Sequence, residues 1–457
     1  MDQNDIQLIE GTGAFYPQDF SFKTLNLVLA NGRKFELRKL LVDFSYYEDI
    51  YTFTTSGYVS VIDAQGFIET LQITGNEFIE VNFGKVKNAP NETDKLFRVY
   101  KVGNRTNSGN MNSEGYTIHF CSEELLLSEQ IKISKGYVGK KISEIVTDVL
   151  KNNLKVPANR INRIESTTGM YDFQIPKMKP FEAISWVSTY ARPAMNSKFT
   201  DMLFFETKDG FNFRSLQSMY KDEIYNTYKY EPKNLNNKTQ NFEEKIVTVL
   251  EYEFSKPFDA LKEIQSGTFA NRLVSIDPLT RSFNVTDFDF SKIESQLQKL
   301  NDNPTLKELE NRLGKMTTEN VEGVLKVATG NSNESFVDYI RQKEGGIAKD
   351  IFIETYVTTR TAMLSLANFT VMKAIIPGDP GITAGRTIQF NLYTLKPTDK
   401  TKALDRFYSG KYLVTAVRHI IQNTKYETVL ELAKESITGK YDQINNNSTS
   451  IKEAIST

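Results

Sequence analysis

Residues 376–392 read IPGDPGITAGRTIQFNL, a segment rich in glycine and proline followed by an alternating one. The apolar residues Ile388, Phe390 and Leu392 alternate with polar ones, which is the period-two pattern of a half-buried β-strand. Gly385 is followed by Arg and Thr, whereas a phosphate-binding loop requires Lys and then Ser or Thr, and the glycine spacing also differs from G-x-G-x-x-G. The stretch therefore predicts a Pro/Gly turn that opens a strand.

The composition of the whole chain bounds its class. Its 457 residues suffice for about three domains. Hydrophobic residues make up 39% and charged residues 25%, with a formal net charge of −1, so we expect a globular protein without specific nucleic acid binding. The start MDQNDIQLIE lacks the regions of a signal peptide, and no run of about 18 apolar residues occurs. We expect neither secretion nor membrane insertion.

Catalytic chemistry has few candidate residues in this sequence. The two histidines, His119 and His419, lie in strand-like runs outside any zinc-binding spacing. The single cysteine, Cys121, excludes an intramolecular disulfide and a cysteine-based zinc site. No G-x-S-x-G motif is present, although a pair of carboxylates remains open among 57 acidic residues. We therefore predict no enzyme, no catalytic, cofactor-binding or metal-binding residue, and no cofactor.

The N-terminal part of the chain has the pattern of an all-β domain, which we place at residues 1–125. Short alternating runs follow one another and are separated by Gly, Asn and Pro. The predicted strands are residues 37–47, 56–64, 66–74, 76–83, 96–102 and 115–121.

The period then changes, and residues 126–220 are predicted to form an α+β domain. One helical face is formed by Ile142, Ile145, Val146, Val149 and Leu150. A second helix is predicted to begin at Pro180 and to stop before Pro193. Asp209 followed by Gly210, between two aromatic-rich arms, is typical of a tight hairpin turn.

Strand patterns return in residues 221–272 and 351–435, which we predict to form a second β-barrel-like domain. Its expected strands are residues 245–254, 349–360, 367–376, 386–392, 411–421 and 425–432, with a helix at 257–265. Residues 273–350 are predicted to be a polar, partly helical insertion with a helix at 303–313, and residues 436–457 a flexible tail.

Three strands of the first β domain recur, in the same order, in the second. IEVNF (79–83) matches IQFNL (388–392), FRVYKV (97–102) matches YLVTAV (412–417), and YTIHF (116–120) matches YETVL (426–430). The predicted fold is therefore mainly β with α+β parts: two duplicated β-barrel-like domains, an α+β domain between them and the insertion. Three such chains in a ring would present six nearly equivalent barrels.

This order of domains, with a DG hairpin ending in FRSL, resembles the central hub proteins of contractile-tailed bacteriophage baseplates. The likeness is carried by TFANRLVSIDPLTRSFNVTDFDF (268–290) and RTAMLSLANFTVMKAIIPGDPGITAGRTIQFNL (360–392). It is nearest to the hubs of T-even-like myoviruses, including those of cyanobacterial phages, and more distant to the hub part of type VI secretion spike proteins. The resemblance covers residues from about 30 to 435.

The resemblance implies a homotrimeric ring in the tail baseplate of a virion, assembled in the host cytoplasm. Its implied partners are a central spike protein, tail tube or tube-initiator proteins, baseplate wedge proteins and a tape measure protein. Two alternatives stay open: a tail-associated cell-wall hydrolase with carboxylates in residues 287–350, and a glycan- or receptor-binding tail protein suggested by 22 tyrosines and 30 phenylalanines.

A channel through such a ring should have neutral or acidic walls. Basic side chains on the wall would pair with the phosphates of the DNA and slow its exit. The polar face of the repeated strand offers candidate lining residues: Glu80, Asn82, Gln389 and Asn391. The neighbouring apolar positions should face the barrel cores, so these side chains line either the channel or the outer surface.

Overall fold

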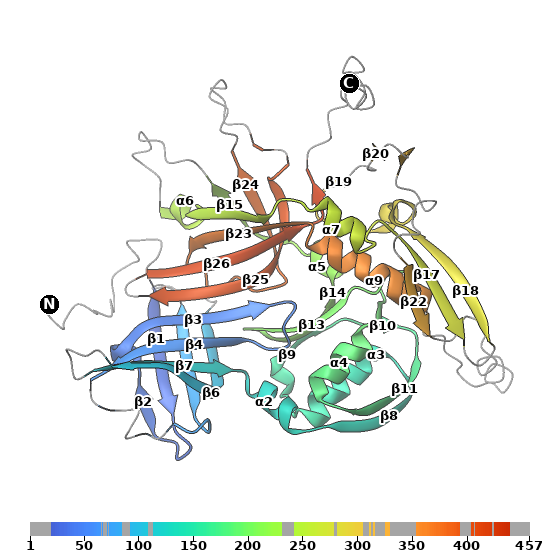
Figure 1. Ribbon diagram of the computed structural model, residues 1–457. Coiled ribbons are helices and arrows are strands. Elements are labelled where there is room, and N and C mark those ends of the chain that lie inside the picture. The colour runs from blue at the N-terminus through green and yellow to red at the C-terminus, as the bar shows by residue number, and fades with distance from the viewer. Residues whose placement is uncertain are drawn as a thin grey trace, which may run out of the picture.

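A single thirteen-stranded sheet connects the first and last thirds of the chain (Figure 1). The computed structural model describes residues 20–64, 66, 71, 73–84, 92–107, 113–230, 242–277, 281–304, 310–311, 314–315, 325–329, 353–393, 404–405, 407–422 and 425–438. Strands predominate, so the prediction of a mainly β protein with α+β parts is confirmed.

The large sheet contains two groups of strands that are far apart in sequence. The first group is β1 (Ser21–Val28), β2 (Lys34–Glu36), β3 (Leu41–Asp49), β4 (Ser56–Asp63), β5 (Phe78–Gly84), β6 (Thr93–Asn107) and β7 (Glu114–Cys121). The second is β15 (Ile224–Tyr230), β16 (Glu251–Lys256), β23 (Thr370–Pro377), β24 (Thr387–Leu392), β25 (Gly410–Gln422) and β26 (Lys425–Lys434). The order β2-β1-β5-β6-β7-β4-β3-β25-β26-β23-β16 places the two groups side by side, with β24 on β25 and β15 on β24.

Most predicted strands of the first group are present. Each buries alternate side chains in an aromatic core that includes Phe44, Phe83 and Phe120. The prediction missed β1 and β2, and it extended β3 over the short 3-10 helix η1 (Arg38–Leu40). The predicted strand at 66–74 lies largely outside the described residues.

The middle of the chain folds as predicted into helices and small sheets. Its elements are α2 (Glu123–Gln130), β8 (Ile133–Lys140), α3 (Ile142–Asp148), the π-helical η2 (Val149–Asn153), η3 (Ala158–Arg160), β9 (Ile161–Ile164), β10 (Thr167–Thr168), β11 (Tyr171–Met178), α4 (Pro180–Ser188), β12 (Arg192–Pro193), β13 (Met202–Thr207), β14 (Gly210–Ser215) and α5 (Leu216–Lys221). The predicted helical face from Ile142 to Leu150 is buried in one core with α4, which begins at Pro180 as expected.

The predicted hairpin turn is also confirmed. Thr207 lies opposite Gly210, which has a φ of 119°. A Cβ on Gly210 would lie 2.3 Å from the backbone oxygen of Arg160, so both the backbone conformation and the close approach require glycine.

The region predicted as the insertion contains a three-stranded sheet of β17 (Ala270–Asp277), β18 (Ser282–Asp289) and β22 (Leu325–Thr329). Two short 3-10 helices, η4 (Phe290–Lys292) and η5 (Glu294–Gln296), come directly after β18 in the chain. The predicted helix at 303–313 is wrong where the structure describes it. Those residues belong to β19 (Asn303–Pro304), which pairs with β27 (Ser436–Ile437), and to β20 (Glu310–Asn311), which pairs with β21 (Gly314–Lys315). Proline holds the residue before it in an extended conformation, and helix propensity alone is a weak determinant.

Two predictions in the second strand group are also corrected. Residues 349–360 were expected to form a strand, but the described part begins helix α9 (Ile353–Ala367). Thr359, Ala362, Met363 and Leu366 are buried at helical spacing, and α9 packs against β17, β18 and β26. The predicted strand at 245–254 is wrong at its start, where helix α6 (Phe242–Ile246) lies, and is confirmed for residues 251–254, which belong to β16. The predicted helix at 257–265 is present as α7 (Ala260–Gln265).

The expected flexible tail begins too early, because Ser436 and Ile437 are buried and paired in β27. Residues 439–457 lie outside the described residues. The domain boundaries drawn from the sequence remain predictions.

Candidate functional site

The first two strands of the proposed repeat match residue by residue. Ile79 of β5 lies opposite Phe97 of β6, and Ile388 of β24 lies opposite Tyr412 of β25. These are the positions that the sequence match aligns, and the pairs on either side also correspond. The two antiparallel ladders therefore have the same register.

A β-bulge recurs at the same place in the next ladder. Between β6 and β7 the pairing skips Tyr100, and between β25 and β26 it skips Thr415. The match of FRVYKV with YLVTAV aligns these two residues. A bulge disrupts a ladder at one position, so its recurrence is a specific similarity between the two copies.

The third strand of the repeat needs a correction of two residues. The sequence match aligns Phe120 with Leu430, but the partner of Val99 is Phe120 and the partner of the equivalent Val414 is Leu432. A shift of two residues leaves each side chain on the same face of the strand, so the pattern alone could not detect it. With this correction, the antiparallel runs β5-β6-β7-β4-β3 and β24-β25-β26-β23-β16 correspond strand by strand.

The two runs meet where β3 pairs with β25. The antiparallel ladder extends from Asp43 opposite Gln422 to Asp49 opposite Ala416, which makes the sheet continuous across the junction (Figure 1).

Polar and aromatic side chains reinforce this junction. The Arg418 guanidinium donates hydrogen bonds to the Ser45 hydroxyl and to the Tyr58 hydroxyl, each at 3.1 Å through Nη2. The rings of Tyr46 and His419 stack with their centroids 5.8 Å apart. The junction is thus a packed interface as well as a ladder.

A buried carboxylate connects the first strand group to the helical region. Glu206 of β13 accepts hydrogen bonds from the Lys95 ammonium and the Arg160 guanidinium, both at 3.0 Å, and from the Thr55 backbone N–H at 3.0 Å and the Ser122 hydroxyl. Burial opposes ionisation of Glu206, but the two cations outweigh it and hold the pKa of this carboxyl below its usual range. The ion cluster therefore requires both regions to be in place.

A second buried carboxylate reaches the loop that precedes β24. Glu48 of β3 accepts hydrogen bonds from the Ala384 backbone N–H at 3.0 Å, from the Tyr46 hydroxyl at 3.0 Å and from the Lys208 backbone N–H. Burial raises the pKa of Glu48 to about 7 although Lys95 and these donors oppose the shift. The loop next to Gly385 is therefore held by contacts within the protein, as the predicted turn requires.

The four predicted channel residues lie on two strands that the structure does not bring together. Glu80 and Asn82 are on β5, and Gln389 and Asn391 are on β24, in separate runs of the sheet. All four are half-buried, whereas their apolar neighbours on the same strands are buried. The predicted alternation is confirmed, but which of the two polar surfaces they form stays a prediction.

The contacts of these residues differ between the copies. Glu80 accepts hydrogen bonds from the Asn26 amide at 3.0 Å and from the Lys34 ammonium at 2.9 Å, and these bonds lower its pKa. The Gln389 amide donates to the Asn391 side-chain oxygen at 3.1 Å. The first polar face thus carries a compensated charge and the second is neutral.

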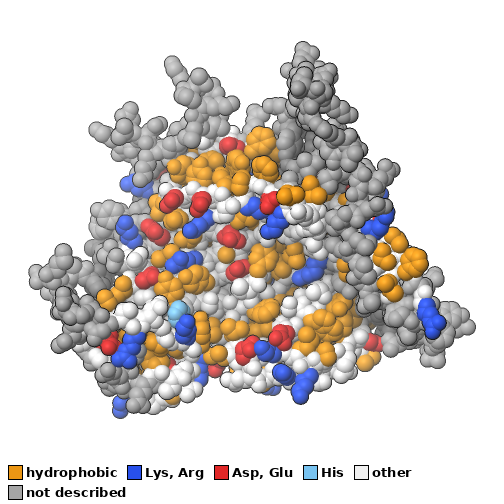
Figure 2. Space-filling model, in the orientation of Figure 1, with side chains coloured by type: hydrophobic (Ala, Val, Ile, Leu, Met, Phe, Trp, Pro, Cys, Tyr) orange, Lys and Arg blue, Asp and Glu red, His pale blue; other side chains and the backbone are white. Residues whose placement is uncertain are grey.

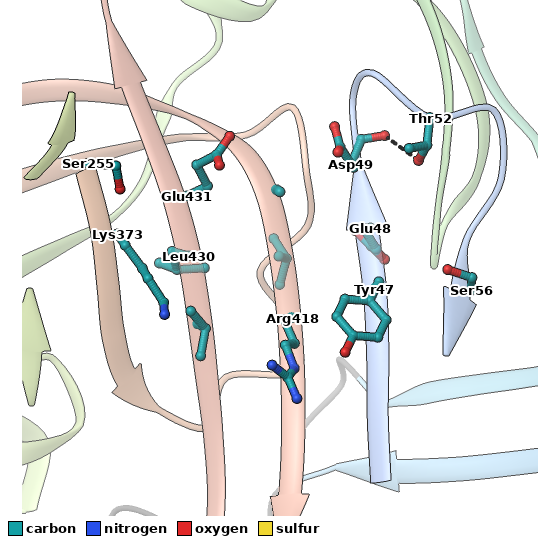
Figure 3. A pocket seen from close by; sticks show the side chains of 13 residues that line it. Tyr47, Glu48, Asp49, Thr52, Ser56, Ser255, Lys373, Arg418, Leu430 and Glu431 are labelled. Carbon is teal, nitrogen blue, oxygen red and sulfur yellow. Dashed lines mark hydrogen bonds between the residues drawn. The ribbon is translucent and has the colours of Figure 1, made fainter. Parts of the chain in front are cut away.

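A cavity of about 400 Å³ lies beside the junction of the two runs (Figure 3). Lys373 and Arg418 line it together with Asp49, Glu48 and Glu431, from four strands of the sheet. Both signs of charge are present, without the nucleophile-and-base arrangement that acyl transfer requires. Basic and acidic side chains are likewise interspersed over the face shown in Figure 2.

The two histidines and the cysteine considered for catalysis lie on strands of the large sheet, buried or half-buried among its side chains. Burial lowers the pKa of His419 to about 3, and its Nδ1 lies 2.8 Å from the Tyr426 hydroxyl. Burial and the nearby Lys101 lower the pKa of His119, and burial raises the pKa of the Cys121 thiol to about 12. Within the described ranges, no group of three or more His, Cys, Asp or Glu could hold a metal ion. No described helix is long and apolar enough to cross a membrane.

Sequence reasoning missed the buried carboxylates that join the regions. Glu206 ends the aromatic run MLFFE, and a charge in such a run is the one signal that could have indicated a buried ion pair. Glu48 lies in a polar-looking stretch, YYEDI, that gives no comparable signal.

Comparisons with known proteins give a fold but no family. No family model matches the chain, and no curated protein matches it in sequence. The 43 kDa tail protein of prophage MuSo2 from Shewanella oneidensis aligns with a TM-score of 0.53 at 9% identity, over 90% of this chain and 98% of that one. A tail protein from Neisseria meningitidis MC58 has a TM-score of 0.49 at 8% identity, over 91% and 97%.

A third structure is the E. coli c3393 protein, described as a component of the type VI secretion system with similarity to T4 bacteriophage tail proteins gp27 and gp5. Its TM-score is 0.41 at 10% identity, over 91% of this chain and 77% of that one. Among these three, the Shewanella structure exceeds a TM-score of 0.5, and this chain is similar in fold to that phage tail protein.

Proposed function

We propose that the chain is a structural hub of a phage tail baseplate: a ring-shaped homotrimer that joins a six-fold tail tube to a three-fold central spike. The observation that carries the proposal is the pair of strand runs with matched register and a matched bulge in one continuous sheet. Fold likeness to a phage tail protein supports a role in the tail.

The symmetry argument links the duplication to an adaptor. Three copies of a chain with two equivalent runs form a ring that repeats approximately six times on one side and strictly three times on the other. In this proposal the six-fold side contacts tail tube or tube-initiator proteins, and the three-fold side contacts the spike. Baseplate wedge proteins surround the ring of the contractile tail, and the tape measure protein and then the DNA pass through its channel during ejection.

The proposal makes the chain a structural protein of the virion rather than an enzyme. Its histidines and cysteine are buried or half-buried in sheet contacts. Many of its aromatic side chains are also part of the core, including Phe44, Phe97 and Phe120. The hydrolase alternative depends on residues 287–350, most of which lie outside the described ranges. The described aromatic cluster of Tyr230, Tyr252, Phe254 and Tyr408 is half-buried against the core of the second run, which does not favour the glycan-binding alternative.

Mass measurement of the purified protein tests the proposal. We expect a particle of three times the 52.2 kDa chain mass, stable to dilution because obligate interfaces bury on the order of 2,000 Å² or more. Electron microscopy of that particle should show a torus with six similar lobes. A stable monomer, or a ring with another number of chains, would contradict the hub.

A further inference from the structure

Two strand edges of this chain correspond to the two strands of its internal junction. In the matched runs, β16 takes the place of β3 and β6 takes the place of β25. Within one chain β3 pairs with β25, but among the described residues β16 pairs only with β23, and β5 covers β6 only along residues 93–98. The outer edges of β16 and of residues 101–107 are therefore left without a described partner strand.

The equivalence of β16 with β3 can be followed through the ladders. Ser45 of β3 lies opposite Tyr58 of β4, and Glu253 of β16 lies opposite Lys373 of β23. Tyr58 and Lys373 are themselves equivalent through the third strand of each run. Glu253 thus occupies the position of Ser45.

The equivalence of β6 with β25 is obtained in the same way. Ile420 of β25 lies opposite Glu427, and Thr106 of β6 lies opposite Gly115. Glu427 and Gly115 are equivalent under the two-residue correction of the third strand. Thr106 thus occupies the position of Ile420, which at the internal junction lies opposite Ser45.

We propose that β16 of one copy pairs antiparallel with residues 101–107 of β6 in the next copy, with Glu253 opposite Thr106. This pairing would correspond to the β3–β25 ladder, interrupted on the β6 side by the bulge between Gly103 and Thr106, and it would close the sheet into a ring. It is an addition of one strand to an exposed sheet edge, and it rests on the proposed homotrimer.

Exposure distinguishes the two edges from the internal junction. Ser45 and Tyr46 are fully buried at the junction with β25, whereas the equivalent Glu253 is exposed and Phe254 is half-buried. Large apolar side chains are also exposed beside both edges, namely Leu96 (54%) and Tyr100 (48%) of β6 and Leu250 (42%), Phe258 (66%) and Leu261 (66%) around β16. Apolar exposure on both sides of a matching pair of edges is expected where a second copy packs.

The charges of the two edges are complementary. The β16 edge carries Glu251 and Glu253, and its third charge, Lys256, is paired with Glu263 within the chain. The β6 edge carries Lys101 and Arg105, of which Arg105 also pairs with Glu114 within its own chain. Opposite charges on facing strands favour the pairing, whereas two copies of the same edge would repel. Charged residues can also simply protect an edge from aggregation, so a test must separate the two roles.

Cysteine cross-linking tests the register directly. Opposite residues of antiparallel strands have Cα atoms about 4.5–5.5 Å apart, within reach of a disulfide. The chain with both Glu253→Cys and Thr106→Cys should give covalent trimers on a denaturing gel after mild oxidation. Each single variant should give none, and a mixture of the two single variants, co-assembled after denaturation, should give dimers. Both positions are exposed, so the variants should fold, and thermal unfolding checks that they do.

Glu253→Cys combined with Lys101→Cys is the matched control. By the same equivalence Lys101 takes the place of Ala416, four ladder positions from Ile420. The two cysteines of this control would lie about 13 Å apart along the strand at a rise of about 3.3 Å per residue, so it should not cross-link. A trimer of the expected mass in which the Glu253–Thr106 pair does not cross-link would overturn the strand pairing and leave the hub intact. A stable monomer would overturn the hub itself. Covalent chains longer than three would contradict a closed ring.

A charge exchange gives an independent measurement. Glu253→Arg should raise the dissociation constant of the trimer about tenfold at low salt, because it places Arg near the partner's basic edge. Adding Arg105→Glu to the same chain should restore assembly, with Arg105→Glu alone measured to account for its internal pair. If the charges only protect the edges, the double variant will show no rescue, and the proposed pairing is wrong.

Discussion

Glu206 is a single residue on which two regions of the chain depend. Its carboxylate is fully buried against Lys95 and Arg160. Removing one partner of a buried ion pair leaves an uncompensated charge. We expect Glu206→Gln to lower the free energy of unfolding by about 3 kcal/mol, measured by urea denaturation at fixed protein concentration.

An exposed pair provides the control for this prediction. Asp287 and Arg272 are joined by hydrogen bonds of 2.7 and 3.0 Å, but both side chains are about one-third exposed. Solvent screens such pairs, so Asp287→Asn should cost less than about 1 kcal/mol. Equal losses in the two variants would show that the Glu206 cluster contributes no more than a surface pair.

Glu48 gives the stability of the protein a pH dependence. Its folded-state pKa of about 7 lies above its ordinary value of 4.5, so the folded state binds the proton more tightly than the unfolded state. The contribution of Glu48 to the free energy of unfolding is complete below pH 4.5 and is lost as the pH rises to about 7. It amounts to at most about 3 kcal/mol. Glu48→Gln should therefore flatten the curve of unfolding free energy against pH in that interval. Parallel curves for the two proteins would refute this assignment.

At the scale of elements, Gly385 determines how β24 begins. Its φ is 83°, and an added Cβ would lie 2.9 Å from Cζ of Phe205 and 3.2 Å from Sδ of Met219. Gly32 has nearly the same φ, 81°, but open space around it. We expect Gly32→Ala to cost about 1 kcal/mol for the left-handed backbone alone, and Gly385→Ala to cost about 1–3 kcal/mol more for the steric clash.

Thermal unfolding of the two glycine variants measures that difference. If both lose the same stability, the contact with Phe205 adjusts freely and the loop does not fix the start of the strand.

The sequence predicted elements whose own period determines them and failed where distant contacts decide. Strand β24 and helix α4 carry clear alternation, helical spacing and a first-turn proline. Helix α9 was mistaken for a strand because its first residues are β-branched and alternate, whereas the apolar side chains buried at helical spacing, Ala362, Met363 and Leu366, come later. The repeat was predicted from three short matches, but only the ladders revealed the two-residue shift in its third strand.

The polar strand faces, the internal junction and the open strand edges could be predicted only in part. The polar faces that carry Glu80 and Gln389 follow from alternation along each of their two strands. The internal junction depends on pairing between strands more than 300 residues apart, as in the bond from Arg418 to Ser45. A local pattern contains no information about that pairing, nor about which strand edges it leaves open.

For the whole molecule, the channel prediction concerns the polar faces of both copies. If Glu80 and Gln389 line the channel, replacing each with lysine should give normal particles that release DNA more slowly at low salt than at high salt, because phosphates pair with the new cations. Gln130→Lys, at the exposed end of α2, should leave release unchanged. Because Glu80 pairs with Lys34, Gln389→Lys alone separates the channel effect from the loss of that pair. Unchanged release at every ionic strength would assign both faces to the outer surface.

The pairing of β3 with β25 also implies a delay during synthesis, because the two strands are translated at different times. Ser45 and Arg418, which bond across it, are separated by 373 positions in the chain. At about 5–20 residues per second, β3 leaves the ribosome roughly 20–75 s before its partner strand exists. During that interval the nascent chain carries an uncovered edge of the kind that recruits other strands, so aggregation should be greatest when translation is slow and many copies are made together.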